Sequence, residues 1–372
     1  MKYCKKCVMP NTKPQIKFDR FGICEACNFH KKKNSVNSKG INWKKRNDEF
    51  NKLIKKIKSK KAPLYDVCVP VSGGKDSITQ VNYLLNKGLR ILCVNVDYGI
   101  KTEIGVKNLD LVTKMGAHLN IYRPSKILQR KIIKISFKDY GDPDLLSHCL
   151  VHGYPIRLAI QLNIPMVLLG ENSAYEYSGE KKINEKKMSD AYFKYYAYNS
   201  GITPKQFGKN YNIDYKHLIP YELPKKKLLK KTNAVFSSYF FNWSSEKNLK
   251  IATKYGFKRL KKPGEGTYRN YVGIDEKINR VHQYLKLLKF GYGRGTDHAC
   301  EDIRNKKISR IKAINLVKKY DRVSLSEYFV KDFCEFLKIS KKDFYKVLNK
   351  YTNKKIWNFK NNKPFIKKDN LK

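Results

Sequence analysis

The alternation of apolar and polar positions divides the chain into stretches with different predicted structure. A charged stretch at 41–60 carries apolar side chains at mostly helical spacing, which predicts an amphipathic linker helix. Four short apolar runs then predict buried strands, at 65–71, 90–97, 117–125 and 164–172. Amphipathic stretches between them predict helices, at 78–85, 102–115 and 154–162. Strands that alternate with helices favour a parallel sheet covered on both faces, so we expect a doubly wound α/β domain over 61–200.

Residues 201–372 show a looser pattern. Turns and aromatic residues come first, and amphipathic stretches at 275–290 and 308–320 predict helices. Two polar clusters, at 265–271 and 291–304, are expected to be loops because glycines interrupt any apolar periodicity there. We interpret this part of the chain as a mainly helical substrate-binding region.

Four of the nine cysteines lie near the start of the chain in two pairs. Cys4 and Cys7, and Cys24 and Cys27, form two C-x2-C motifs with sixteen residues between them. This spacing is typical of a zinc ribbon or knuckle, because both thiolates of a pair reach one tetrahedral ion. We expect residues 1–40 to be a structural zinc-binding segment, and a redox or iron–sulfur role is the alternative.

Composition and charge narrow the class of protein. The net charge of +47 would suit nucleic acid, but only 13 of the 79 basic residues are arginine and lysine is spread along the whole chain. This spread fits a compositional bias toward lysine, so nucleic acid is not the expected partner. The same field would attract an anionic small substrate, so the charge alone does not choose between the two. No run approaches about 18 apolar residues, and the first ten residues lack the apolar segment of a signal peptide. We therefore expect a soluble, cytoplasmic protein without membrane insertion.

The segment VPVSGGKDS, from Val69 to Ser77, joins the first predicted strand of the α/β domain to a helix. It is not a Walker A loop, because Asp76 follows Lys75 and no glycine lies five residues before Gly74. Ligands of α/β sheets bind where strands end and helices begin. Two glycines let backbone amides approach an anion, and the helix start adds its positive dipole end. The loop therefore predicts a phosphate site.

The S-G-G-x-D-S pattern resembles the PP-loop ATP pyrophosphatases, a group that contains GMP synthetase, NAD synthetase and tRNA thiolation enzymes. The resemblance implies ATP and Mg²⁺ as cofactors, and AMP and pyrophosphate as products. It implies catalytic roles for Lys75, Asp76 and Glu171, with Glu171 holding magnesium or a reacting group. The residues implied to bind the nucleotide are Ser72, Gly73, Gly74, Lys75, Asp76, Ser77 and Asp97.

Segments along nearly the whole chain resemble the N-acetyl sugar amidotransferases of the PseA and WbpG type, from bacterial surface-polysaccharide and pseudaminic acid biosynthesis. They include YCKKCVMPNTKP, DRFGICEACNF, LLGENSAYEYSG, EGTYRNY and FGYGRGTDHACEDIRN. The resemblance implies conversion of an acetamido group on a nucleotide-activated sugar into an acetamidino group. The acetamido oxygen would attack ATP, and ammonia would then displace AMP. No G-x-C-x-G elbow surrounds any cysteine, so a separate glutaminase subunit is expected to supply ammonia.

Two polar clusters near the C-terminus are expected to hold the sugar nucleotide. Arginines suit carboxylates and phosphates, while hydroxyl, carboxylate and imidazole groups offer hydrogen bonds to sugar hydroxyls. The candidates are Tyr268, Arg269, Asn270, Arg294, Thr296, Asp297, His298 and Arg304.

The sequence leaves two other functions open. A tRNA thiolation enzyme would share the PP-loop, the cysteine pairs and the positive charge, and would use Cys149 and Cys300. A non-catalytic nucleotide-binding scaffold of a glycan assembly complex is the weaker alternative.

Overall fold

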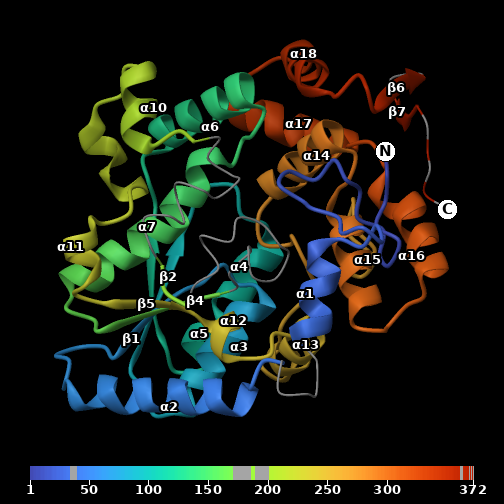
Figure 1. Cartoon of the computed structure of the whole chain (residues 1–372). Helices are drawn as coiled ribbons and strands as arrows, with labels where there is room; N and C mark the ends of the chain where they lie inside the picture. The colour runs from blue at the N-terminus through green and yellow to red at the C-terminus, as the bar shows by residue number, and fades with distance from the viewer. Residues whose placement is uncertain are drawn as a thin grey trace.

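A five-stranded parallel sheet forms the centre of the first half of the molecule (Figure 1). The computed structural model describes residues 1–33, 40–170, 186–188, 201–360, 363–367, 369 and 371. The sheet order is β3-β2-β1-β4-β5, and all neighbouring strands are parallel. The strands are β1 (Val67–Pro70), β2 (Ile91–Val96), β3 (His118–Tyr122), β4 (Met166–Leu169) and β5 (Asn233–Phe236). The predicted parallel α/β sheet is confirmed.

Successive residues of the strands face opposite sides of the sheet, and helices cover both sides. Val67 and Val69 of β1 belong to a core with α2 (Trp43–Ser59), α3 (Lys75–Leu85), α5 (Leu111–Lys114) and α12 (Ser237–Phe240). Cys68, between these valines, belongs to a second core that includes Ile156 and Ala159 of α7 (Leu145–Gln161). This alternation follows from the two-residue period of a strand. It explains why β1, β2 and β4 are nearly continuous apolar runs, whereas β3, at the edge of the sheet, is largely exposed.

Several elements differ from the sequence-based expectation. The strand β5 lies beyond residue 200, so the sheet continues past the boundary expected for the ATP-binding domain. Its four residues are too few to show a clear pattern. Helix α6 (Lys126–Tyr140) was not predicted, although Ser125 caps its start and Gly141 ends it with a φ of +59°. The helix predicted at 102–115 is divided into α4 (Glu103–Leu109) and α5.

The rest of the chain is mainly helical, as predicted. Its helices are α10 (Pro204–Asn210), η3 (Tyr215–Tyr221), α11 (Lys226–Leu229), α13 (Ser245–Lys254), α14 (Ile278–Phe290), α15 (Arg294–Arg304), α16 (Arg310–Leu316), η4 (Val317–Asp321), α17 (Glu327–Leu337) and α18 (Lys341–Tyr351). A hairpin of β6 (Trp357–Lys360) and β7 (Lys363–Ile366) follows.

The expectation of a loop at 291–304 is wrong, because α15 occupies most of this range. Glycines at 291, 293 and 295 suggested turns, and only Gly291 has a positive φ. The buried face of α15 is made of small and polar side chains, so the helix lacks the apolar stripe by which a helix is recognised.

The N-terminal segment packs against the C-terminal helices rather than standing alone. Its last element is α1 (Glu25–Lys33). The four paired cysteines share one core with Ala299 of α15 and Ala313 of α16. The Thr12 hydroxyl donates to the carbonyl of Phe290 at 2.5 Å, and His30 Nε2 lies 3.0 Å from Asn305 Oδ1. In Figure 1 this segment runs beside α14, α15 and α16.

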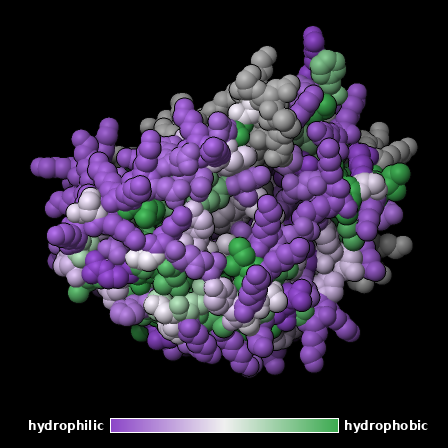
Figure 2. All heavy atoms as spheres, turned by 90° about the horizontal axis from the view of Figure 1, so that it is seen from below, coloured by the Kyte–Doolittle hydropathy of each residue, from purple (hydrophilic) through white to green (hydrophobic). Residues whose placement is uncertain are grey.

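The surface is hydrophilic over most of the face seen in Figure 2, with hydrophobic residues in small separate areas. Among the described residues, no helix has both the length and the apolar character needed to cross a membrane.

Two glycines allow three backbone segments to lie in contact. Gly73 has a φ of +89°, and a Cβ on it would lie 2.8 Å from the amide nitrogen of Leu109 in α4. Gly105, also in α4, faces the segment before α14, where a Cβ would lie 2.3 Å from the carbonyl oxygen of Asp275. Both distances are too short for a side chain. The loop after β1, helix α4 and the approach to α14 can therefore pack only with glycine at these positions.

We expect Gly105→Ala to lower the free energy of unfolding by about 2 kcal/mol, measured in urea. In a helix, alanine is more favourable than glycine by about 1 kcal/mol. A loss of stability in this variant would therefore be due to the clash between the new Cβ and the backbone. Gly170→Ala is the matched control, because a Cβ there meets nothing within 4 Å. Equal or greater stability of Gly105→Ala would contradict the close packing.

Candidate functional site

The loop from Ser72 to Ser77 lies at the carboxyl end of β1, which has β2 on one side and β4 on the other. After β1 the chain continues to β2 and β3 on one side, whereas β4 and β5 lie on the other side, so the strand order reverses at β1. Open α/β sheets bind ligands at such a point. The amide of Gly74 donates to Ser72 Oγ at 3.2 Å, and the Ser77 hydroxyl donates to the Gly74 carbonyl at 2.9 Å. Helix α3 starts at Lys75, and no side chain of the described residues caps it. Its first amides suit an anion.

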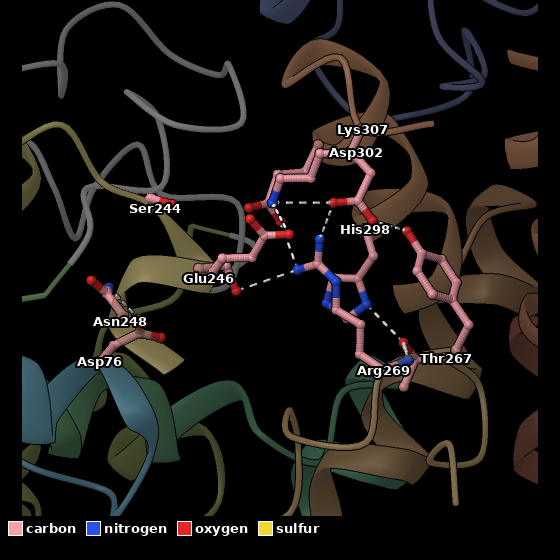
Figure 3. A network of polar contacts seen from close by, with 12 residues as sticks. Asp76, Ser244, Glu246, Asn248, Thr267, Arg269, His298, Asp302 and Lys307 are labelled. Carbon is pink, nitrogen blue, oxygen red and sulfur yellow. Dashed lines mark hydrogen bonds and ion pairs between the residues drawn. The ribbon is translucent and has the colours of Figure 1, made fainter. Parts of the chain in front are cut away.

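Lys75 and Asp76 form an ion pair inside this loop. Lys75 Nζ lies 2.5 Å from Asp76 Oδ2, and the lysine side chain is buried. Asn248 of α13 donates from Nδ2 to Asp76 Oδ1 at 2.7 Å, as Figure 3 shows. The ammonium of Lys75 also lies 5.9 Å from the ring centre of Tyr271. Asn248 and Tyr271 both come from beyond residue 200. The C-terminal region therefore contributes side chains next to the loop.

Asp97 follows β2 at the same edge of the sheet. Its carboxylate accepts from the Gly99 amide at 2.9 Å and forms an ion pair with Arg123 Nε at 2.9 Å. Burial would raise the pKa of Asp97, but the Gly99 amide and the Arg123 charge outweigh it and lower the pKa. Asn95 donates to the Val71 carbonyl at 2.6 Å and so ties the ends of β1 and β2 together. Glu171 lies outside the described residues.

Arg269 and Tyr268 bind carboxylates of α15. The Arg269 guanidinium contacts Asp302 Oδ1 at 2.7 Å and Glu301 Oε2 at 2.8 Å, and the Tyr268 hydroxyl donates to Asp302 Oδ2 at 2.5 Å. Burial would lower the pKa of Arg269, but the two carboxylates raise it above its ordinary value. These contacts, drawn in part in Figure 3, hold the segment 265–271 on α15. Substrate binding by Arg269 stays a prediction.

His298 is buried beside the segment 265–271. Its Nδ1 lies 2.7 Å from the Thr267 hydroxyl. Burial holds the pKa of His298 well below its ordinary value, and the positive charges of Arg269, Arg294 and Lys75 lower it further. His298 is therefore neutral at neutral pH. The influence of Lys75 shows that the predicted phosphate loop and the C-terminal cluster share one electrostatic environment.

The remaining predicted substrate residues have partners within the protein. Thr296 donates to Asp321 Oδ2 at 2.5 Å, and Asp297 Oδ2 lies 2.5 Å from Lys286 Nζ. Asn270 donates from Nδ2 to the Leu260 carbonyl at 2.8 Å. Arg304 faces the cysteines instead. Burial would lower its pKa, but the charges of Cys300 and the paired cysteines raise it.

The four paired cysteines form a compact cluster. The sulfur atoms of Cys4, Cys7, Cys24 and Cys27 all lie within 4.8 Å of one another, and all four residues are buried. Cys4 Sγ accepts from the amides of Cys24 at 3.2 Å and Cys7 at 3.4 Å. Hydrogen bonds from Cys24, Cys27 and Cys7 lower the pKa of the Cys4 thiol, and the corresponding bonds from Cys24, Cys4 and Cys7 raise the pKa of Cys27, so the four thiols ionise as one coupled group. Four sulfur donors at these distances fit a tetrahedral metal ion such as zinc.

Sequence reasoning missed three residues that the structure brings to these sites. Asn248 and Tyr271 reach the loop after β1 from distant segments, and no motif surrounds Asn248. Cys300 packs in the core of the cysteine cluster. Its spacing of four residues from Arg304 could have predicted that both face the cluster, had α15 been recognised as a helix.

We expect the protein to bind about one zinc ion per chain, and Cys24→Ser to lose most of it. Metal analysis by mass spectrometry measures both. Cys334→Ser is the matched control, because Cys334 is buried in another core and should keep the metal. A full zinc content in Cys24→Ser, or iron with a visible charge-transfer absorption, would contradict the assignment.

We expect Arg269→Ala to lower the free energy of unfolding by about 3 kcal/mol, because Asp302 and Glu301 would lose their partner in a largely buried site. Arg259→Ala, at an exposed position, should change it by less than about 0.5 kcal/mol. Urea unfolding of both variants makes the comparison. Equal stability of the two variants would show that the network contributes nothing measurable.

Comparison with known proteins agrees with the resemblance found in the sequence. Residues 265–370 match the family model described as LPS biosynthesis protein WbpG-like, C-terminal domain. A search of curated proteins found no match. The matched range contains the segment 265–271 and helices α14 and α15, and thus all of the predicted substrate residues. Over this C-terminal domain, the resemblance to the WbpG type is confirmed.

Proposed function

We propose that this protein is an ATP-dependent amidotransferase that converts an acetamido group of a nucleotide-activated sugar into an acetamidino group, in bacterial surface-glycan biosynthesis. One observation carries the proposal. The SGGKDS loop at the end of β1 adjoins the WbpG-like domain, through the contact of Lys75 with Tyr271. A nucleotide loop and a sugar-biosynthesis domain that meet at one crevice are what such a reaction requires.

The residues around the loop fit the triphosphate of ATP, and we propose a doubly wound PP-loop fold for this half. Gly73 leaves room for a close backbone approach, and the uncapped start of α3 offers amide donors. Lys75 would neutralise phosphate charge, and Asp97 would meet the ribose or adenine. Asp76 and Glu171 would hold Mg²⁺, which prefers carboxylate oxygens and supplies positive charge to the departing pyrophosphate. Donors aimed at this leaving group stabilise charge that develops in the transition state.

The proposed chemistry follows from the weak reactivity of amides. The acetamido carbon is a poor electrophile and its oxygen is a poor leaving group. The oxygen therefore attacks the α-phosphorus of ATP and pyrophosphate leaves. Ammonia next attacks the activated carbon, and AMP leaves with the former acetamido oxygen. A separate glutaminase would supply the ammonia, in the cytoplasm where nucleotide sugars and ATP occur together.

The sugar nucleotide would lie between the loop and α15. His298 is neutral, and the positive charge of Lys75 acts on it, so it would donate or accept a hydrogen bond without adding charge. Arg294, Thr296 and Asp297, from the first turn of α15, would contribute contacts to the nucleotide or to sugar hydroxyls. Zinc at the paired cysteines would act structurally, by holding the N-terminal segment on α15.

The position of the other cysteines favours this proposal over tRNA thiolation. Cys149 lies in the core between α6, α7 and the C-terminal helices, whereas Cys300 lies in the core of the cysteine cluster. Both are fully buried, and they belong to different cores. A sulfur-transfer pair would need exposed, neighbouring thiols in the crevice.

We expect ATP, ammonium and an acetamido sugar nucleotide to give AMP, pyrophosphate and a sugar product about one mass unit lighter, as oxygen is replaced by nitrogen. Glutamine should not replace ammonium unless the glutaminase is added. Asp76→Asn should lower turnover by a factor of about 100 or more, as expected for lost transition-state stabilisation. Chromatography of nucleotides and mass spectrometry of the sugar measure these outcomes.

ADP as the main nucleotide product would contradict the PP-loop assignment. Cysteine-dependent modification of a tRNA, without a mass shift on any acetamido sugar, would favour thiolation instead. An Asp110→Asn variant is the matched control for Asp76→Asn, because Asp110 is an exposed aspartate whose partner is Lys114 on the protein surface.

A further inference from the structure

Two histidine–aspartate pairs lie side by side outside the residues considered so far. His282 Nδ1 lies 2.9 Å from Asp142 Oδ1, and His148 Nδ1 lies 3.3 Å from Asp144 Oδ2. The centres of the two imidazole rings are 5.8 Å apart. The side chains of His282 and Asp142 are 12% and 15% exposed, so they are mostly buried but remain partly accessible to solvent. Paired groups of this kind can transfer protons.

The pairs lie close to the carboxyl end of β2. Tyr98 follows β2, and its hydroxyl donates to the carbonyl of Ser147, the residue before His148, at 3.0 Å. The segment before α14 is hydrogen-bonded to the residues that follow β2, because the Lys277 amide donates to the Ile100 carbonyl at 3.0 Å. Burial raises the pKa of Glu276 in this approach segment, and the negative charges of Asp144 and Asp97 raise it further. The pairs and the expected nucleoside residue Asp97 thus border the same region.

Helix α14 connects the pairs with the predicted sugar site. Lys286 lies one turn after His282, so the two side chains share one face of the helix. Lys286 binds Asp297, and its charge acts on both His282 and His298. Proton transfer at His282 would therefore occur beside the residues proposed to hold the substrate.

The Asp142 carboxylate fixes the form of the His282 ring. It accepts the hydrogen of Nδ1, which leaves the lone pair of the neutral ring on Nε2. Within the described part of the chain, no hydrogen bond to Nε2 of His282 is found. Burial would lower the pKa of His282, but the charge of Asp142 and its hydrogen bond raise it. Burial would raise the pKa of Asp142, but the charge of His282 lowers it to about 2, so the carboxylate stays ionised.

We propose that His282, oriented by Asp142, is the base that accepts a proton from ammonia during amidine formation, and this inference rests on the proposed function. As the carbon–nitrogen bond forms, the ammonia nitrogen becomes positively charged. One nitrogen–hydrogen bond then breaks, its proton passes to His282 Nε2, and its electron pair stays on nitrogen. The carbon–oxygen bond breaks, and its electrons leave with the AMP oxygen. Asp142 acts as a positioning residue.

The test separates the two half-reactions in a single turnover with ATP, ammonium and the acetamido sugar nucleotide. His282→Gln should release pyrophosphate at a rate within about threefold of the wild type, whereas its rate of amidine formation should fall about 100-fold, a typical loss for a general base. His217→Gln, at an exposed histidine, is the matched control and should change neither rate. The preserved first step also demonstrates that the variant is folded.

The pH profile tests the role of Asp142. Amidine formation should fall as the pH drops through the pKa of His282, because the protonated ring accepts no proton. Asp142→Asn removes the charge that raises this pKa, so the acidic limb of the profile should move to lower pH while the maximal rate falls. The titration of ammonium is the same in both proteins. The charged or titratable groups that face His282 are Asp142, Asp144, His148, Lys286 and Lys289.

Failure of the inference and failure of the proposed function give different results. If wild-type protein releases no pyrophosphate in response to any acetamido sugar nucleotide, the proposed function is wrong and the inference falls with it. If pyrophosphate is released but His282→Gln forms amidine as fast as His217→Gln, only the inference is overturned. Equal losses in both half-reactions, or an unmoved acidic limb in Asp142→Asn, also overturn it.

Discussion

The close approach of three backbone segments at Gly73 and Gly105 is the constraint on which the rest of the site depends. The loop after β1 lies against α4, and α4 lies against Asp275 before α14. A side chain at either glycine would force these segments apart, because the nearest atoms belong to the backbone and cannot rotate away. The contact of Lys75 with Tyr271 joins the loop after β1 to the segment that leads to Asp275.

Helix α15 links the Arg269 network to the cysteine cluster. Glu301 and Asp302 anchor Arg269, and His298 contacts Thr267 beside that network. Cys300, on the same helix, packs in the core of the paired cysteines, and the charges of these cysteines act on Arg304. A metal ion at the cluster would therefore stabilise the position of α15. The cysteine cluster and the Arg269 network are in this way coupled through one helix.

The sequence predicted the features that rest on local patterns. Four of the five strands were predicted. Continuous apolar runs predicted β1, β2 and β4, because strands buried on both faces need apolar residues at every position, whereas β3 is an edge strand that is largely exposed. The C-x2-C spacing predicted that the four cysteines lie together, because each half of a metal knuckle is formed by a short segment. Helix α15 was missed because its buried face is small and polar. Asp142 and His282 are separated by 140 residues in the sequence, and they meet because the helices on either side of Asp142 share one core with α14.

The proposed activation of the acetamido oxygen can be tested by isotope transfer. The protein would be supplied with ATP, ammonium and a sugar nucleotide whose acetamido oxygen is ¹⁸O, and the released AMP would be analysed by mass spectrometry. Attack by this oxygen on the α-phosphorus predicts AMP that is about two mass units heavier, with the label on its phosphate. Unlabelled AMP formed together with the amidine product would contradict the mechanism.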